Sequence, residues 1–158
     1  MRRSQEPCHS DRRGECCPDR QRHVALLSEV NLESLDYLYI PAPDFEAAVR
    51  FYTVTLGGEL RWRIRDGSTW VAAVRLTREG PLVLLANHLE SGHTVLIYRV
   101  TSLTDVQRKL TDCGWELGAS FEIPQGPCVI VRDPSGQRLA IYERVRPGVD
   151  QHFEGRFD

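Results

Sequence analysis

The residues of this sequence whose types and spacing could most readily do chemistry are two histidines and a glutamate near its middle. His88, Glu90 and His93 form a His-x-Glu-x-x-His motif. Imidazole nitrogens and carboxylate oxygens bind zinc and similar divalent cations, and a histidine also serves as a general base. The motif spans Ser91-Gly92, however, which is typical of a linker between structural units. A solvated linker that carries polar residues is therefore the simplest interpretation.

The cysteines form no motif with a metal-site spacing. Three of the five crowd the polar N-terminal segment together with a histidine, and the last two lie in apolar, periodic segments. A zinc site would need a close pair followed by a second pair at a fixed distance, which is missing here. We expect free thiols in a reducing cytoplasm. The cysteines are Cys8, Cys16, Cys17, Cys113 and Cys128.

Three arginines alternate with apolar residues along a predicted strand. Arg61, Arg63 and Arg65 would share one face and could follow a line of phosphates. No aromatic residue lies between them on that face, so we favour a charged, solvent-facing side that protects an edge strand. The apolar residues expected on the opposite face are Leu60, Trp62 and Ile64.

Composition places the chain among globular domains. It has 158 residues, 41% hydrophobic and 27% charged, with a net charge of −2. This balance gives no bulk attraction to nucleic acid, and no apolar run approaches the roughly 20 residues of a membrane span. We expect no nucleic-acid or membrane partner and a cytoplasmic location. Residues 1–29 are predicted to be a disordered arm, residues 30–146 a single domain and residues 147–158 a C-terminal tail.

Alternation and capping residues predict two similar units. In the first, Asp44 caps a helix that ends at Gly57-Gly58, and in the second Ser102 caps a helix that ends at Gly114. The strands of the first unit are expected at 35–40, 59–65, 69–76 and 81–86. Those of the second are expected at 94–100, 116–121, 128–132 and 138–143.

The two units match at an offset of 56 to 58 residues, which indicates an internal duplication. Tyr37 matches Val95, and Leu84 matches Ala140. We therefore predict an α+β fold of two tandem βαβββ modules, at about 35–90 and 93–144. Together they would form a curved mixed sheet with a concave cleft.

Two motifs resemble a known superfamily. The spacing Asp44-x6-Phe51-Tyr52-x3-Leu56-Gly57 and the turn Asp133-Pro-Ser-Gly136 are similar to those of vicinal oxygen chelate proteins, which include glyoxalases, bleomycin resistance proteins and extradiol dioxygenases. The resemblance implies a homodimer. It also implies a divalent metal, held in the cleft by His, Glu or Gln from the first and last strands of each module.

The positions that the resemblance assigns to those ligands are unsuited to a metal in this chain. They are Tyr37, Leu84, Val95 and Ala140. Three of the four side chains are hydrocarbons, whereas a catalytic metal site takes three or more oxygen, nitrogen or thiolate donors. We therefore predict that the metal-site residues are absent and that the protein uses no cofactor.

Strand alternation predicts what lines the cleft instead. An apolar floor with tyrosines and an arginine would suit a flat aromatic or hydrophobic ligand, with Arg99 available to an anionic group. The expected ligand-binding residues are Tyr37, Tyr39, Trp70, Leu84, Val95, Ile97, Arg99, Ala140 and Tyr142.

These expectations lead to three functional hypotheses. The first is a metal-free small-molecule binding protein of the bleomycin-resistance type, with a possible role in antibiotic resistance. The second is a metal-dependent lyase, isomerase or dioxygenase that uses relocated ligands such as His93. The third is a metal-free enzyme with Tyr37 or Tyr142 as acid or base, which requires a tyrosine pKa well below the usual value of about 10.

Overall fold

The structure is a computed structural model that describes residues 29–158. The predicted disordered arm lies outside the described residues except for Glu29, and so do Cys8, Cys16 and Cys17. Within the described part, no helix combines the length and the apolar character that crossing a membrane requires.

The first half of the domain folds as the predicted βαβββ module. Asp44 begins its helix by accepting a hydrogen bond from the backbone N–H of Ala47 (3.2 Å), and a π-helical turn, Phe51–Thr55, extends that helix. Gly57 then turns the chain with a φ of 70°. The elements are β1 (Ser34–Pro41), α2 (Phe45–Arg50), β2 (Glu59–Asp66), β3 (Thr69–Arg75) and β4 (Leu82–Ala86).

The second half repeats this order. The Ser102 hydroxyl accepts a hydrogen bond from the N–H of Asp105 (3.3 Å) at the start of the helix, and Gly114 ends it with a φ of 80°. Asp44 and Ser102 therefore cap equivalent helices, as the internal repeat predicts. The elements are β5 (Val95–Val100), α3 (Leu103–Asp112), β6 (Leu117–Ile123), β7 (Gly126–Arg132) and β8 (Arg138–Glu143).

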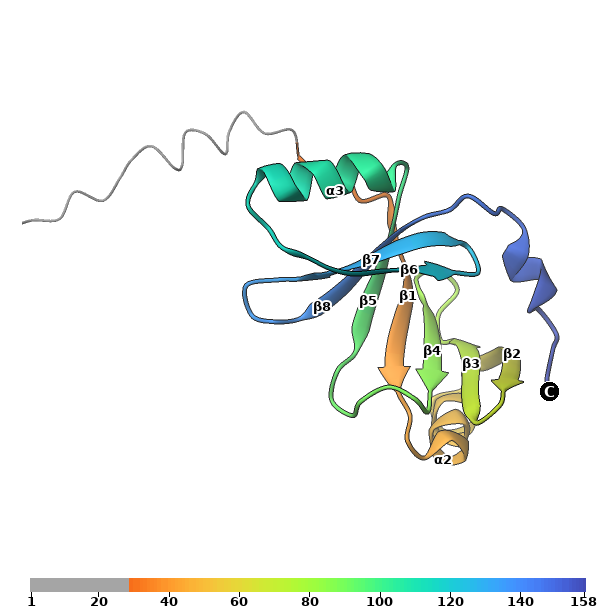
Figure 1. The fold of residues 1–158 in the computed structure, drawn as a ribbon. Coiled ribbons are helices and arrows are strands. Elements are labelled where there is room, and N and C mark those ends of the chain that lie inside the picture. The colour runs from red at the N-terminus through yellow and green to blue at the C-terminus, as the bar shows by residue number, and fades with distance from the viewer. Residues whose placement is uncertain (1–28) are drawn as a thin grey trace, which may run out of the picture.

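All eight strands form one mixed sheet in the order β2-β3-β4-β1-β5-β8-β7-β6. The modules join where β1 and β5 pair antiparallel, and each of these strands pairs in parallel with the last strand of its own module. The sheet curves between α3, which lies over the second module, and α2, which lies beside the first (Figure 1). The predicted α+β class and the two-module mixed sheet are confirmed.

Three buried clusters hold the sheet in place. One packs α2 on the first module through Phe45 and Val49, and another packs α3 on the second through Leu103 and Val106. The third lies on the opposite face of the central strands, where it forms the floor of the cleft. Its buried members are Tyr37, Val95, Ile97, Cys128, Ala140 and Tyr142.

Register shifts break the regular alternation in β1, β2 and β6, and those in β1 and β2 bear on the cleft. In β1 the register with β5 shifts between Leu35 and Tyr37, and in β2 the register with β3 shifts between Leu60 and Trp62. The second shift corrects a prediction, because Leu60 packs in the core under α2 whereas Trp62 and Ile64 face the cleft. A bulge inserts one residue and so reverses the facing of the residues that follow.

The C-terminal residues 147–158, called the strap from here on, run from the end of β8 to the outer edge of β2 (Figure 1). The strap contains a 3₁₀ turn, Val149–His152. Its last residues lie along β2, where Phe157 forms a parallel bridge with Arg63. Within the bridge the N–H of Arg63 donates to the backbone carbonyl of Arg156 (2.8 Å), and the N–H of Asp158 donates to the backbone carbonyl of Arg63 (3.1 Å).

Candidate ligand-binding cleft

The four central strands place most of the predicted site residues on one surface. Tyr37 lies opposite Ile97, and Ile97 lies beside Ala140. In the next row along the strands, Tyr39 lies beside both Leu84 and Val95. These six side chains pack in or against the same cleft-floor cluster. The pairing of β1 with β5 and their parallel partners therefore brings together residues that are far apart in the sequence.

Of the other three predicted residues, two share this face and one does not. Tyr142 is fully buried in the cleft-floor cluster, and Arg99 lies next to it. The exception is Trp70, which was expected in the cleft but packs on the helix side of the sheet. Its ring is stacked on that of Phe45, with the centroids 5.7 Å apart. The guanidinium of Arg63 lies over the Trp70 ring at 4.5 Å and holds it there through a cation–π contact.

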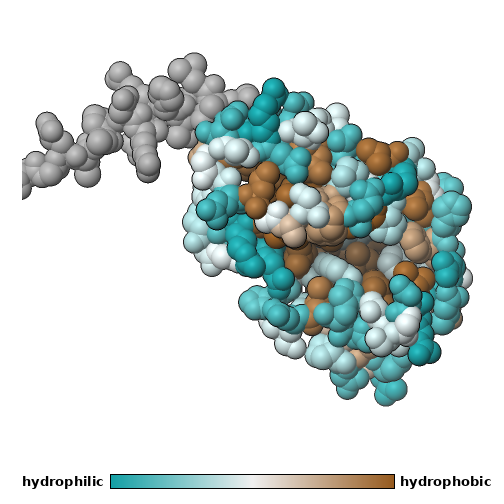
Figure 2. All heavy atoms as spheres, in the orientation of Figure 1, coloured by the Kyte–Doolittle hydropathy of each residue, from teal (hydrophilic) through white to brown (hydrophobic). Residues whose placement is uncertain are grey.

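A cavity of about 180 Å³ opens in this face. Figure 2 shows hydrophobic surface gathered around a hollow in the middle of the molecule. Four predicted residues line the cavity, namely Tyr37, Tyr39, Leu84 and Ile97. The lining residues that the sequence did not single out as ligand-binding are Trp62, Ile64, Val71, Ile123, Pro124, Gln125 and Phe153.

Hydrogen bonds concentrate at one end of the cavity. The Gln125 amide donates to Asp150 (2.7 Å) and to the Tyr37 hydroxyl (3.3 Å), and Tyr37 donates to Asp150 (3.2 Å). Arg144 forms an ion pair with the same carboxylate. Burial and the negative charge of Asp150 raise the pKa of Tyr37 far above its ordinary value. The Tyr37 phenol is therefore neutral at physiological pH.

A second polar cluster surrounds Tyr142 of the cleft floor. The bulge in β1 brings Asp36 against the Tyr142 hydroxyl, which donates a hydrogen bond to its carboxylate. Arg99 lies 3.2 Å from Glu33 and 3.7 Å from Asp36, so it is neutralised within the protein. Burial, followed by the hydrogen bond to Asp36, raises the pKa of Tyr142.

The raised pKa values of these tyrosines bear on the hypothesis that a tyrosine acts as an acid or base. It requires a lowered pKa, whereas burial raises the pKa of both Tyr37 and Tyr142, and the nearby carboxylates raise it further. Burial alone raises the pKa of Tyr39 to about 12. These directions run against Tyr37 and Tyr142 as the acid or base.

The donor set at the four presumed ligand positions does not fit a metal ion. The phenol of Tyr37 is committed to Asp150 and Gln125, and Leu84, Val95 and Ala140 offer only hydrocarbon. Among residues 29–158, no three His, Cys, Asp or Glu side chains are grouped so that they could hold a metal. A divalent cation would thus lose its water shell without replacement ligands at these positions.

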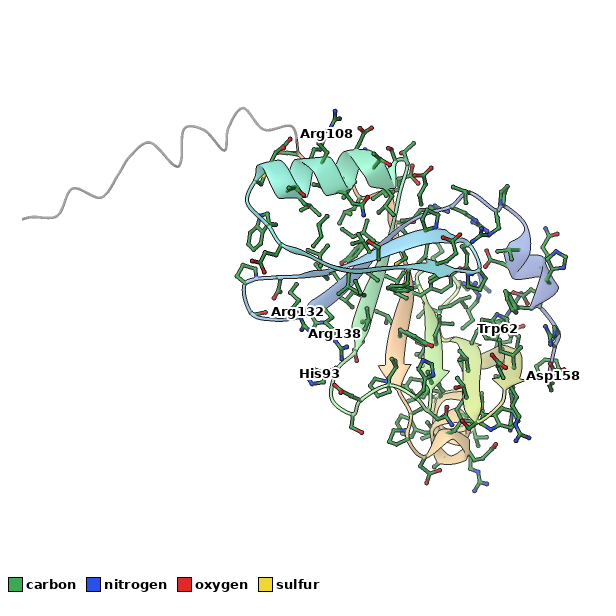
Figure 3. All side chains as sticks on the ribbon, viewed as in Figure 1. Trp62, His93, Arg108, Arg132, Arg138 and Asp158 are labelled. Carbon is green, nitrogen blue, oxygen red and sulfur yellow. The ribbon has the colours of Figure 1, made fainter. Side chains whose placement is uncertain are left out.

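The histidine motif does not supply the missing ligands. His93 is exposed in the loop before β5, beside Gln137 and Arg138 of the hairpin that leads into β8. Figure 3 places it on the opposite side of the molecule from Trp62, which lines the cavity. His88 instead contacts the cleft rim, where its Nε2 lies 3.2 Å from the Tyr39 hydroxyl. The predicted solvated linker describes His93 better than the metal hypothesis does.

A wider groove of about 460 Å³ follows the edge strand β6. Two glycines and the charged residues Glu116 and Arg132 form much of its wall, next to the half-exposed Trp115. Because ligand sites are enclosed and mostly apolar, the smaller cavity on the concave face is the better candidate.

Two tandem βαβββ modules with a cleft on the concave face of a single sheet define the vicinal oxygen chelate class. A profile of the Glyoxalase/Bleomycin resistance protein/Dioxygenase superfamily matches residues 34–141, more than half of the chain. The protein therefore belongs to this superfamily. The match ends before the strap begins. No curated protein matches the sequence.

Solved structures agree on the fold. Methylmalonyl-CoA epimerase from Mycobacterium tuberculosis is 17% identical with a TM-score of 0.62, over 77% of this chain and 94% of that one. A Streptomyces coelicolor methylmalonyl-CoA epimerase variant in complex with 2-nitronate-propionyl-CoA is 15% identical, with a TM-score of 0.57 over 73% and 100%. A catechol 2,3-dioxygenase is 18% identical, with a TM-score of 0.55 over 73% and 42%. At such identities the likeness establishes the fold and not the activity.

Proposed function

We propose that this protein binds a small, mainly apolar molecule in the concave cleft without the help of a metal ion. One observation carries the proposal: Leu84, Val95 and Ala140 place hydrocarbon where a metal centre would need donor atoms, on the floor of the cleft. An apolar cleft gains affinity from burial, at roughly 25 cal/mol per Å² of apolar surface, and needs no cation for it.

The dimensions of the cavity favour a guest of about one ring. Its volume of about 180 Å³ is close to that of engineered apolar cavities of about 150 Å³, which bind benzene. The walls carry aromatic rings as well as aliphatic side chains, among them Trp62 and Phe153. Such walls suit an aromatic ring through stacking and edge-to-face contacts.

Gln125 favours a guest that donates a hydrogen bond. A carboxylate only accepts, so the amide nitrogen of Gln125 must face Asp150, which fixes the orientation of the amide. The side-chain oxygen Oε1 of Gln125 accepts no hydrogen bond from residues 29–158, and Gln125 lines the cavity. A phenol or an aromatic amine would pair with this oxygen while its ring lies against apolar walls.

The test is a binding measurement with 4-fluorophenol, followed by ¹⁹F NMR. We expect a saturable shift of the fluorine signal with the native protein and loss of binding in Leu84→Phe, which fills the cavity. The matched control is Val54→Phe, because Val54 is 76% exposed on the π-helical turn, away from the cleft. Binding that survives in Leu84→Phe, or that is absent from the native protein, contradicts the proposal.

Elemental analysis of the purified protein addresses the metal-dependent alternative. We expect substoichiometric zinc, nickel, manganese and iron, with no change in His93→Ala. A full equivalent of one of these metals, lost in His93→Ala, would establish the metal-dependent enzyme instead. The homodimer and the cytoplasmic location stay predictions, and light scattering after size exclusion measures the first of them.

A further inference from the structure

The strap forms one wall of the candidate site, although it lies beyond the segment that matches the superfamily. Phe153 lines the cavity, and its ring lies against Trp62 with the centroids 5.4 Å apart. Asp150 holds Tyr37 and Gln125 at the polar end. The superfamily match covers residues 34–141, so this wall lies outside the matched segment.

The strap is attached at both ends but is nowhere buried. Just before it begins, the N–H groups of Val145 and Arg146 both donate to the backbone carbonyl of Gln125 (3.1 Å each). At its far end, Glu154 accepts a hydrogen bond from Arg61 (3.0 Å), and Gly155 donates to the Arg61 carbonyl (3.1 Å). None of residues 147–158 is buried, and Phe157 is 58% exposed.

Apart from the packing of Phe153 on Trp62, the strap is held by hydrogen bonds and ion pairs of exposed or half-buried groups. Segments held in this way open locally at lower cost than a packed sheet does. Opening of the strap would remove Phe153 from the cavity and expose Trp62 and the β2 edge. The sheet itself would stay intact, because its three buried clusters contain no strap residue.

We propose that the strap is a displaceable cover that determines which ligands the cleft accepts. Closed, it limits the cleft to a guest of about one ring; open, it admits a guest of two or more rings, which takes the place of Phe153. The proposal rests on the proposed binding function and adds a size limit to it. Ligands larger than one ring compete with the strap, whereas single-ring ligands bind beneath it.

The experiment compares 4-fluorophenol with the two-ring 2-naphthol on three proteins: the full chain, the chain ended after Arg146, and Phe153→Ala. We expect both altered proteins to bind 2-naphthol at least tenfold more tightly than the full chain does. Affinity for 4-fluorophenol should fall in Phe153→Ala, which removes an aromatic wall of the cavity, and should stay within threefold of the native value in Phe157→Ala. The matched control is Phe157→Ala, which alters an exposed strap residue that does not line the cavity. Equal affinity of all four proteins for 2-naphthol overturns the cover.

Amide hydrogen exchange separates the cover from the binding function. In the free full chain, we expect the amides of Gly155 and Asp158 to exchange at least a hundredfold faster than that of Leu38 in the central strand. Saturation with 2-naphthol should accelerate both strap amides further. If no probe binds to any of the proteins, the proposed function is overturned. If the strap amides exchange as slowly as that of Leu38, the cover is overturned, whatever the binding result.

Discussion

The hydroxyl of Tyr37 donates a hydrogen bond to Asp150 (3.2 Å), although 113 residues separate the two in the chain. Tyr37 lies in β1, where the two modules join, and Asp150 lies in the strap that reaches over to β2. The bond thus ties the cover of the cleft to the middle of its floor. Gln125 supports it from the β6–β7 hairpin by donating to both partners.

Removal of this bond should destabilise the protein modestly. In Tyr37→Phe, we expect the free energy of unfolding to fall by about 1 kcal/mol, because Asp150 keeps Gln125 and Arg144 as partners and is not left unpaired. Urea denaturation followed by circular dichroism measures the change. Tyr98→Phe serves as the control, since the Tyr98 hydroxyl forms no hydrogen bond in the described part of the chain. A loss as large in the control would contradict the assignment.

Tyr39 should ionise late in an alkaline titration. Burial raises its pKa to about 12, and the pKa of the unfolded chain is about 10. A raised pKa means that the folded protein favours the neutral phenol. This contribution to stability is complete below pH about 10 and is lost as the pH rises through about 12. We therefore subtract the absorbance of Tyr39→Phe at 295 nm from that of the native protein. This difference should rise near pH 12, whereas a rise near pH 10 would show that the Tyr39 hydroxyl is solvated.

Gly126 is required for the close packing of β7 on the end of β8. A Cβ atom at this position would lie 2.0 Å from the carbonyl oxygen of Glu143, a backbone atom that cannot move aside. We expect Gly126→Ala to destabilise the domain by about 3 kcal/mol or more, as overpacking does in a tight site. Gly67→Ala is the comparison, because a Cβ atom at position 67 would meet no atom within 4 Å. Its only cost is the backbone strain of a φ of 58°, about 1–2 kcal/mol. If Gly67→Ala unfolded at a lower temperature than Gly126→Ala, this account would be refuted.

Strand alternation was sufficient to find the floor of the cleft. Tyr37, Leu84, Val95 and Ala140 fall on one face because β1, β4, β5 and β8 keep regular pairing at these residues. The helix caps at Asp44 and Ser102 were equally predictable, since each depends on a local side-chain contact. Each of these features follows from a local pattern, namely the alternation within one strand or the first turn of one helix.

The walls of the cleft could not be derived in the same way. The bulges beside Asp36 and Arg61 change the facing of residues within a strand, and no residue type in the sequence marks a bulge. Trp70 was misplaced because its partners, Phe45 and Arg63, come from two other elements. Phe153 depends on the path of the strap, whose contacts with β2 are long-range. Sequence periodicity describes a face of a strand, but it does not describe what a distant segment places over that face.

The apolar floor gives a final prediction, which concerns three of the four presumed ligand positions. Leu84 in β4 and Val95 in β5 flank Tyr39 of β1, and Ala140 in β8 lies one row away beside Ile97, so the three occupy neighbouring rows of the four central strands. If missing donors alone prevent metal binding, Leu84→His combined with Val95→His and Ala140→Glu should create a site of two imidazoles and one carboxylate, a set that binds zinc in catalytic centres.

We expect the triple variant to bind one equivalent of Co²⁺ with visible absorption, and to unfold at a lower temperature than the native protein until the metal is added. The double variant that keeps Val95 is the control and should bind at least a hundredfold more weakly. The native protein should show no cobalt spectrum. A folded triple variant without cobalt absorption would mean that the backbone of the cleft, and not only its side chains, has moved away from metal-binding geometry.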